Sequence, residues 1–341
     1  LTGNLGLQAI RTKQNAEGWV WLGNNKAPDL KDLYAVTGGT SYWDYLPSLN
    51  LKLELPGATM IRFGLAKTLA RPEMNDMRAG ASAPAVDVQA KPPVWGAGNS
   101  GNPGLEPWRA LATDLEVAKF MGKRSYVSLA GYHKRLTTTI YNEKVLRDFS
   151  GFPNYSGVTP ISPYGFATGL ANGKAGSMSG IEAAMSLDGG LFSKSLDGIG
   201  LVVSASKLHT SLKNNNGDDV TFDGSSGQSN NVTAYYERDG ISARISQRYR
   251  SAYVAMERDW AFAPVFRRRP SEKLVDLQLG YAFETGPLKG LSLLLQVNNV
   301  TDEVAVTYKT PNHGAADMGA YLPNFISYFG RQYLFGVNYK L

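Results

Sequence analysis

The chain of 341 residues has no cysteine and only a small net charge. Without cysteine, disulfide bonds, thiolate metal sites and thiol catalysis are excluded. No stretch approaches the ~18 consecutive apolar residues of a membrane-spanning helix, which excludes a helical membrane protein and leaves a β-barrel open. The 35 Lys and Arg exceed the 29 Asp and Glu by 6. Because no basic stripe carries interleaved aromatic residues, we expect no nucleic-acid partner.

Glycine and tyrosine are abundant instead. The sequence holds 37 glycines, and its 18 tyrosines outnumber its 13 phenylalanines, a balance typical of turn-rich β-structure. The one tight basic cluster is Arg267, Arg268 and Arg269, which we interpret as a solvated loop. Leu1 is not preceded by Met or a signal peptide, so we expect a piece of a longer chain.

Alternating apolar and polar residues recur along the chain and predict strands. In residues 49–55, for example, leucine occupies every second position and polar residues stand between. No segment shows useful helical periodicity. The predicted strands, about twelve, cover 3–14, 49–55, 61–66, 109–120, 125–140, 177–189, 198–213, 230–238, 241–250, 273–284, 291–299 and 330–341.

The connections between these strands alternate between short and long. Tight turns are expected at 56–59, 122–124 and 239–240, whereas the connections 71–108 and 141–175 are expected to be long loops. In an antiparallel sheet this alternation puts the short turns at one end and the long loops at the other. Outer-membrane β-barrels have this asymmetry, with short periplasmic turns and long extracellular loops.

The two faces of the predicted strands also differ in polarity. Within 241–250 and 273–284, isoleucine, leucine and aromatic residues alternate with serine, arginine and acidic residues. An apolar outer face and a charged inner face are the pattern of a barrel wall in lipid with a wet lumen. We therefore expect Arg62, Arg244 and Arg248 to face the lumen, where they line the solute path or pack against a plug.

Four segments resemble the C-terminal half of the barrel of TonB-dependent outer-membrane receptors. Residues 46–52 and 61–72 (LPSLNLK and IRFGLAKTLARP) are similar to a hairpin that ends in an SKTLxRP strand exit. Residues 101–107 (GNPGLEP) match a GNPxLxP loop, and 297–303 (VNNVTDE) resemble an NLTD exit. Residues 330–341 resemble the closing strand, with Leu341 where Phe is usual. The style of these motifs is closest to proteobacterial receptors associated with carbohydrate uptake.

This resemblance implies an all-β, up-and-down transmembrane barrel. Residues 1–341 would supply about 12 C-terminal strands of a 22-stranded barrel, and the N-terminal plug and first strands would lie outside this chain. The implied location is the outer membrane of a Gram-negative bacterium. The implied partners are TonB, contacted through the missing N-terminal region, outer-membrane lipid, a small-molecule or oligosaccharide ligand and, optionally, a surface lipoprotein.

No catalytic constellation stands out in the sequence. His133 and His209 are expected on strands and His313 on a loop, without the spacing of a catalytic triad or a metal site. Asp218 and Asp219 fit a solvated turn better than a calcium site. We therefore predict no enzyme activity, no metal and no cofactor.

Aromatic residues in the long connections are the candidate ligand contacts. Exposed aromatic rings with polar neighbours suit stacking on sugars or planar ligands. The candidates are Trp19, Trp21, Trp95, Trp108, Tyr155, Tyr164, Trp260 and Tyr321.

The favoured function is active uptake of a scarce nutrient, such as an oligosaccharide or a metal chelate, energised through TonB. The first alternative is a self-closed twelve-stranded outer-membrane pore or enzyme, which would need an exposed nucleophile such as a serine near His133 or His209. The second is a soluble β-rich carbohydrate-binding protein.

Overall fold

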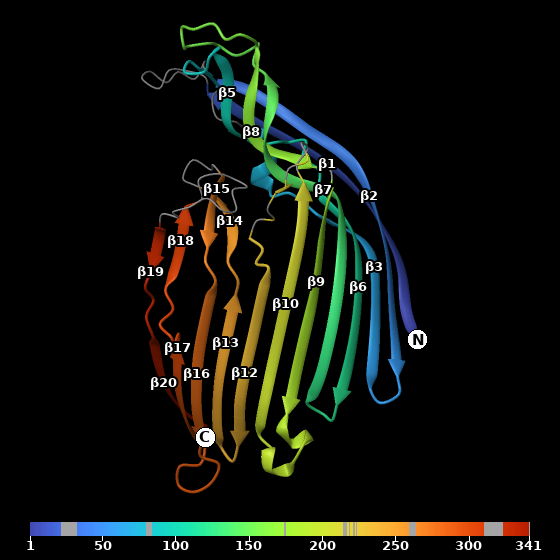
Figure 1. Ribbon diagram of the computed structural model, residues 1–341, viewed down its shortest axis with the longest axis vertical. Helices are drawn as coiled ribbons and strands as arrows, with labels where there is room; N and C mark the ends of the chain where they lie inside the picture. Colours follow the sequence, from blue (N-terminus) through green and yellow to red (C-terminus); the bar gives the residue numbers. More distant parts are fainter. Residues whose placement is uncertain are drawn as a thin grey trace.

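In the computed structural model the chain forms one large curved sheet with a smaller sheet at one end (Figure 1). The structure describes residues 1–21, 33–79, 84–173, 175–213, 217, 219–220, 222, 224–258, 264–309 and 323–340. Neighbours along the main path of the large sheet, called the wall below, are all antiparallel. In order, the wall strands are β1 (Thr2–Trp21), β2 (Leu33–Leu55), β3 (Thr59–Ala70), β6 (Trp108–Met121), β7 (Ser125–Asp148), β9 (Ala175–Asp188), β10 (Ile199–Lys213), β12 (Gln228–Arg238), β13 (Ile241–Arg250), β16 (Glu272–Ala282), β17 (Leu291–Asn298) and β20 (Gln332–Tyr339).

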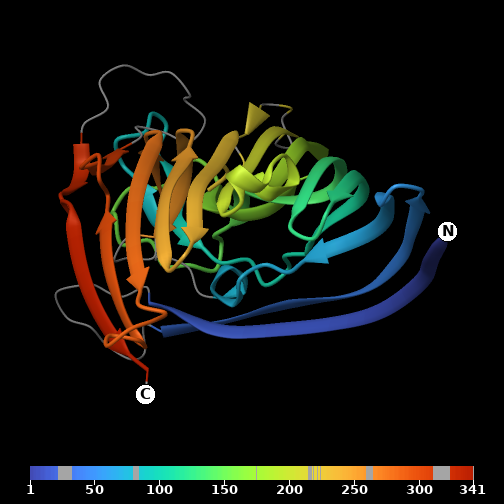
Figure 2. The ribbon, with the colours of Figure 1, turned by 90° about the horizontal axis from the view of Figure 1, so that it is seen from below.

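The all-β, antiparallel architecture confirms the fold predicted from alternation. Each predicted strand overlaps a wall strand, and the Asp239–Gly240 hairpin turn is present, with both residues at positive φ. β1 and β20 stand at opposite ends of the wall and are not paired with each other among the described residues, as Figure 2 shows. The strand number of a closed barrel therefore stays a prediction. Among the described residues no helix has the length and apolar character needed to cross a membrane.

Short turns gather at one end of the wall. The turns β2–β3, β6–β7, β12–β13 and β16–β17 lie together at the bottom of Figure 1, as does the β9–β10 connection with its 3-10 helices η3 (Gly189–Leu191) and η4 (Lys194–Leu196). The long connections lie at the other end. The predicted asymmetry of turns and loops is thus confirmed.

The long connections also contain secondary structure that the sequence did not predict. These connections contain η2 (Met74–Met77), β4 (Ala85–Asp87), β5 (Val94–Ser100), β8 (Tyr164–Gly173), β11 (Asp219–Val220), β14 (Tyr253–Arg258), β15 (Pro264–Arg269), β18 (Ala305–Lys309) and β19 (Pro323–Ser327). β5 pairs in parallel with β8, and β14-β15-β18-β19 form the smaller sheet. Local alternation could not reveal these strands, because they are short and their pairing joins segments far apart in the sequence.

One face of the wall is apolar and exposed. Leu115 and Ile181 lie in one cross-strand row through Gly131, and Leu129 stands beside Val117 and Ala183. The exposed fractions of Leu115, Leu129 and Ile181 are 51%, 58% and 60%. Other large apolar residues on this face, here called the outward face, are Leu5, Leu7, Ile245, Leu279, Leu295, Phe335 and Val337. A continuous apolar belt of this kind exceeds the patches of soluble monomers and suits contact with lipid.

The opposite, inward face is polar and partly covered by the β3–β6 connection. Gln14 donates through Nε2 to the carbonyl oxygens of Pro103 (2.9 Å) and Leu105 (2.8 Å). Asn172 accepts from the Glu106 amide and donates to its carbonyl oxygen, both at 2.9 Å. Leu105 is fully buried. The GNPGLEP segment is therefore a fixed anchor that joins β1, β8 and the start of β6.

A buried ion pair completes this anchor. Arg109 Nε donates to Asp44 Oδ1 at 2.5 Å, and its Nη1 donates to Glu106 Oε2 at 2.6 Å. The Asp44 side chain is 1% exposed and that of Arg109 is 12% exposed. The guanidinium also lies over the Tyr42 ring, 5.2 Å from its centroid. A charge-assisted pair of this geometry fixes β2 against β6 at the long-loop end of the wall.

The strand β8 depends on a glycine. A Cβ at Gly165 would lie 2.1 Å from the backbone oxygen of Trp95 on β5. We expect Gly165→Ala to push β5 and β8 apart at a cost of about 1–3 kcal/mol, seen as roughly tenfold or faster hydrogen exchange of both strands. Gly151→Ala is the matched control, because nothing lies within 4 Å of a Cβ there. Equal exchange in the two variants would contradict the close β5–β8 contact.

Candidate ligand-binding site

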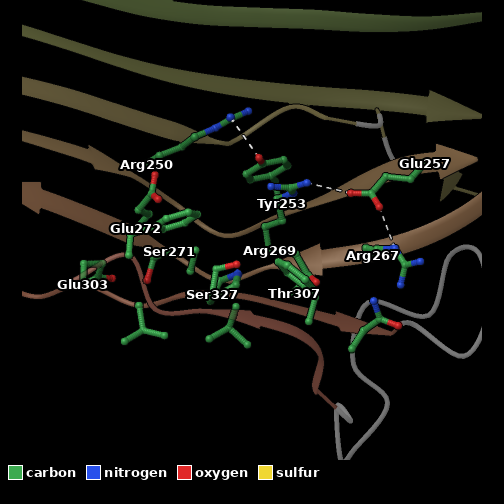
Figure 3. A pocket seen from close by; sticks show the side chains of 17 residues that line it. Arg250, Tyr253, Glu257, Arg267, Arg269, Ser271, Glu272, Glu303, Thr307 and Ser327 are labelled. Atoms are coloured by element: carbon green, nitrogen blue, oxygen red, sulfur yellow. Dashed lines mark hydrogen bonds and ion pairs between the residues drawn. The ribbon is translucent and has the colours of Figure 1, made fainter. Parts of the chain in front are cut away.

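A polar cleft of about 450 Å³ opens at the long-loop end, between the smaller sheet and the ends of β13 and β16 (Figure 3). The register of the smaller sheet builds one of its walls. Tyr253 pairs with Arg269, and Thr307 with Phe325, so alternate residues of β14, β15, β18 and β19 share one face. The lining residues include Arg250, Tyr253, Glu257, Arg267, Arg269, Ser271, Glu272, Glu303, Thr307, Phe325, Ser327 and Phe329.

Glu257 organises two of the arginines. Its Oε2 accepts from Arg267 Nε at 2.7 Å, and its Oε1 accepts from Arg269 Nη2 at 2.8 Å. The hydrogen bond that Arg269 donates to Glu257 raises the pKa of the Arg269 guanidinium above its ordinary value, although partial burial opposes the shift. The two ion pairs with Glu257 hold the guanidinium groups of Arg267 and Arg269 in fixed orientations at the cleft.

Arg250 is held on the other side of the cleft. Its guanidinium carbon lies 3.8 Å from the centroid of the Tyr253 ring, and Nη1 donates to the Tyr253 hydroxyl at 3.2 Å. Nη2 donates to the Gly224 carbonyl oxygen at 2.7 Å. Arg250 pairs in register with Glu272. A stacked cation next to an aromatic ring presents both a flat apolar surface and hydrogen-bond donors.

The lining carries balanced charge. Arg250, Arg267 and Arg269 face three carboxylates, those of Glu257, Glu272 and Glu303. Aromatic rings from Tyr253, Phe325 and Phe329 add apolar surface. Such a lining can donate and accept hydrogen bonds at once, so it suits a ligand rich in hydroxyl groups.

The reading of residues 267–269 as a solvated loop is wrong. Arg267, Arg268 and Arg269 lie on β15, and two of them pair with Glu257. The sequence did carry a signal for this cluster, because three consecutive arginines on a strand place the first and the third on the same face. The signal was missed because the partner carboxylate comes from β14, which was not predicted.

The aromatic candidates whose side chains the structure describes do not line this cleft. Trp19, Tyr155 and Tyr164 are exposed, at 65%, 64% and 51%. Trp95 is buried against Val86, Phe149 and Ala167, so its ring holds the strands of the long-loop end together. Stacking on a ligand requires an exposed ring, whereas Trp95 is only 5% exposed.

Trp108 lies on the inward face. It packs on the cluster of Ala110, Leu136 and Leu212, and its ring meets Phe222 edge-on with 5.7 Å between centroids. Trp21 ends β1, but its side chain is outside the described part. Trp260 and Tyr321 are outside the described residues, as are His313 and Asp218. Ligand contact by the aromatic candidates stays a prediction.

Two of the predicted lumen-facing arginines, Arg62 and Arg244, have partners on the wall itself, whereas Arg248 pairs in register with Leu274 and Asn231 and forms no ion pair among the described residues. Arg62 pairs in register with Glu116, and Nη1 lies 3.0 Å from Glu116 Oε2. Arg244 Nη2 lies 3.1 Å from Glu237 Oε1. Arg62 and Glu116 line a second cleft of about 600 Å³ on the inward face, beside Asn4, Asn50 and Asp114. Whether these side chains meet a plug stays a prediction.

The described residues do not form a catalytic pair around the histidines. Ser179 pairs in register with both His133 and His209, so it is the serine that stands where a nucleophile next to a histidine base would be needed. No hydrogen bond joins Ser179 to either imidazole in the described part of the chain. No group of three potential metal ligands occurs among the described residues either.

An antiparallel wall with an apolar outward face and a polar inward face defines a protein of the outer-membrane β-barrel class. A family model described as "TonB dependent receptor-like, beta-barrel" matches residues 1–300. The chain therefore belongs to the TonB-dependent receptor family, which confirms the resemblance of its motifs. Members of this family lie in the Gram-negative outer membrane and bind TonB and small-molecule ligands.

Solved structures of similar fold are transport receptors. A mutant of the ferric enterobactin receptor PfeA from Pseudomonas aeruginosa, in complex with enterobactin, is 16% identical with a TM-score of 0.58, over 90% of this chain and 42% of that one. The unliganded ferric citrate transporter FecA is 14% identical with a TM-score of 0.54, over 89% of this chain and 39% of that one. The siderophore receptor PirA from Acinetobacter baumannii is 14% identical with a TM-score of 0.53, over 99% of this chain and 46% of that one.

These likenesses show the fold alone at such low identity. The chain spans less than half the length of each of these three receptors. No curated protein matches the chain. A carbohydrate-uptake type stays a prediction, because the similar structures are siderophore and citrate receptors.

Proposed function

We propose that this chain forms the C-terminal wall of an outer-membrane active transporter that takes up a scarce nutrient with energy passed through TonB. The family match over residues 1–300 carries the proposal. The apolar outward face and the polar inward face support it, because a transporter wall must contact lipid on one side and solute on the other. The N-terminal plug and the first strands would come from outside this chain.

The cleft beside Glu257 is the proposed nutrient contact on this chain. It lies at the long-loop end, which is the extracellular end in this fold. Its balanced charge and three aromatic rings favour an oligosaccharide over a strongly anionic metal chelate. The wall performs no bond chemistry in this scheme.

Uptake by whole cells tests this function. The gene that contains this chain is deleted and restored, and the accumulation of labelled oligosaccharides and of ferric chelates is measured with and without TonB. We expect accumulation of one ligand class that falls to background when TonB is absent or the membrane is de-energised. Accumulation that persists without TonB would favour a passive pore.

The Glu257 carboxylate gives a sharper prediction for the cleft. Glu257→Gln keeps the shape but removes the charge that holds Arg267 and Arg269. Because hydrogen bonds between charged groups contribute about 1.5–3 kcal/mol, we expect ligand affinity to fall roughly tenfold or more. Titration of the purified receptor with its transported ligand measures this. Glu237→Gln, which removes the partner of Arg244 on the wall, is the matched control and should leave the affinity unchanged.

A further inference from the structure

Five basic residues gather on the outward face toward the long-loop end. His133 and His209 lie in one cross-strand row on either side of Ser179. Arg135 stands two residues beyond His133 on β7, and Lys207 stands two residues before His209 on β10. Lys67 shares the row of Arg135 through Leu111. These five residues are the outward basic cluster, on the neighbouring strands β3, β7 and β10 with β6 and β9 between them (Figure 1).

The cluster carries charge without an internal counterion. The side chains of His133, Arg135, Lys207 and His209 are exposed, and none of the five forms an ion pair within the described part of the chain. The nearby carboxylates Asp114, Glu116 and Glu182 stand at the alternate positions of β6 and β9, so they face inward. The two signs of charge are thus separated onto opposite faces of the same strands.

The cluster lies where the apolar belt ends. A tilted strand crosses a hydrocarbon layer with about ten residues. If the hydrocarbon layer begins at Tyr126, near the start of β7, ten residues reach its far boundary near Arg135. If it begins at Ile199, at the start of β10, ten residues reach that boundary near His209. Ile181 shares a row with Lys207. Apolar and cationic side chains therefore adjoin at the level where lipid headgroups begin.

From this placement we propose that the outward basic cluster binds the phosphate groups of an anionic lipid in the outer leaflet. Guanidinium and ammonium groups at a membrane boundary attract anionic headgroups, and Arg135 can bind a phosphate through two hydrogen bonds. Strands lie about 4.8 Å apart, which sets the His133 and His209 backbones roughly 10 Å apart, with the small Ser179 between them. This gap accommodates a phosphate, while the acyl chains lie along Leu129 and Ile181.

The proposal rests on the membrane placement in the proposed function but not on the transported nutrient. A soluble anion would not use the adjoining apolar belt, so a lipid is the partner that fits both observations. The cluster also accounts for His133 and His209, for which neither the cleft nor transport has a role.

Lipid binding by the complete receptor tests the inference. The receptor that contains this chain is purified in neutral detergent, and native mass spectrometry measures its dissociation constants for diphosphoryl lipid A and for the same lipid without phosphates. In the test variant R135Q/K207Q two cations of the cluster are removed. The charge-matched control K119Q/K123Q removes two cations at the short-turn end. The heat-modified mobility of each variant on a denaturing gel reports that it is folded.

We expect the receptor to prefer the phosphorylated lipid, R135Q/K207Q to bind it roughly thirtyfold more weakly, and the control to bind within twofold of the unaltered receptor. Excess inorganic phosphate should not displace the lipid. Equal binding by R135Q/K207Q and the control, equal binding of both lipids, or displacement by inorganic phosphate would overturn the proposal. If R135Q/K207Q does not fold, H133Q/H209Q replaces it, with an expected loss of at least threefold.

Nutrient uptake by the same variants separates this inference from the proposed function. TonB-dependent uptake should be unchanged in R135Q/K207Q, because the cluster faces away from the inward face. Uptake without TonB dependence would refute the proposed function and leave the lipid result standing. Loss of phosphate preference with normal uptake in all variants would refute only the lipid site.

Discussion

Arg109→Leu is expected to lower the free energy of unfolding by about 3–5 kcal/mol. The substitution leaves the Asp44 carboxylate, 1% exposed, without its cation. It also removes the partner of the Glu106 side chain in the GNPGLEP anchor. The measurement is urea unfolding of the complete receptor folded into lipid vesicles.

Arg62→Leu is the matched control for this prediction. The Arg62–Glu116 pair has side chains that are 53% and 30% exposed, so its loss should cost no more than about 1 kcal/mol. Adding Asp44→Asn to Arg109→Leu should recover part of the loss, because a neutral amide is cheaper to bury than a carboxylate. Similar unfolding free energies for Arg109→Leu and Arg62→Leu would contradict the buried ion pair as an anchor.

Leu129→Arg should destabilise the receptor in a bilayer by about 2–4 kcal/mol. Leu129 is 58% exposed and lies within the outward apolar belt. In a soluble protein, arginine at such an exposed site would cost almost nothing, because water solvates the charge. A large loss is therefore a specific signature of contact with lipid.

The neighbouring residue supplies the control. Ser128 occupies the adjacent position on β7 and faces inward, in register with Ala184. Ser128→Arg should change the unfolding free energy in vesicles by less than about 1 kcal/mol. If both variants behave alike, the outward face of the wall is not in lipid or the inward face is not in water.

The sequence predicted the wall because each wall strand carries its own signal. Alternation in 49–55 and 273–284 identifies strand and face together, since a slip of one residue would turn leucine toward water. The Asp239–Gly240 turn and the other short connections fix the neighbouring strands. The strands and their faces followed from local chemistry that needs no partner to be recognised.

The long-loop end could not be predicted in the same way. β8 contains glycine at Gly165 and Gly169 and pairs in parallel with β5, so neither strand shows clean alternation. β14 and β15 acquire their roles from Glu257 and Arg267, which meet only when the hairpin forms. The binding cleft was missed because its residues come from strands whose stability depends on long-range pairing.

The roles of the aromatic candidates could not be read from the sequence for a related reason. A tryptophan in a connection can contact ligand or hold the connection together, and its sequence neighbours do not distinguish these roles. Trp95 does the second, with Phe149 5.7 Å away between ring centroids. The arginine triplet at 267–269 was the more informative signal, because its charges require partners once they lie on a strand.

A cysteine scan along β7 tests the central claim, a wall with one face in lipid and one in water, most directly. The chain has no native cysteine, so single cysteines at 126–134 in the complete receptor can be spin-labelled without background from this chain, and any cysteine outside it is first replaced by serine. In bilayers, we predict that labels at 127, 129 and 131 meet lipid-soluble oxygen and labels at 128, 130 and 132 do not. Equal oxygen accessibility along the strand, or the reverse alternation, would contradict the account.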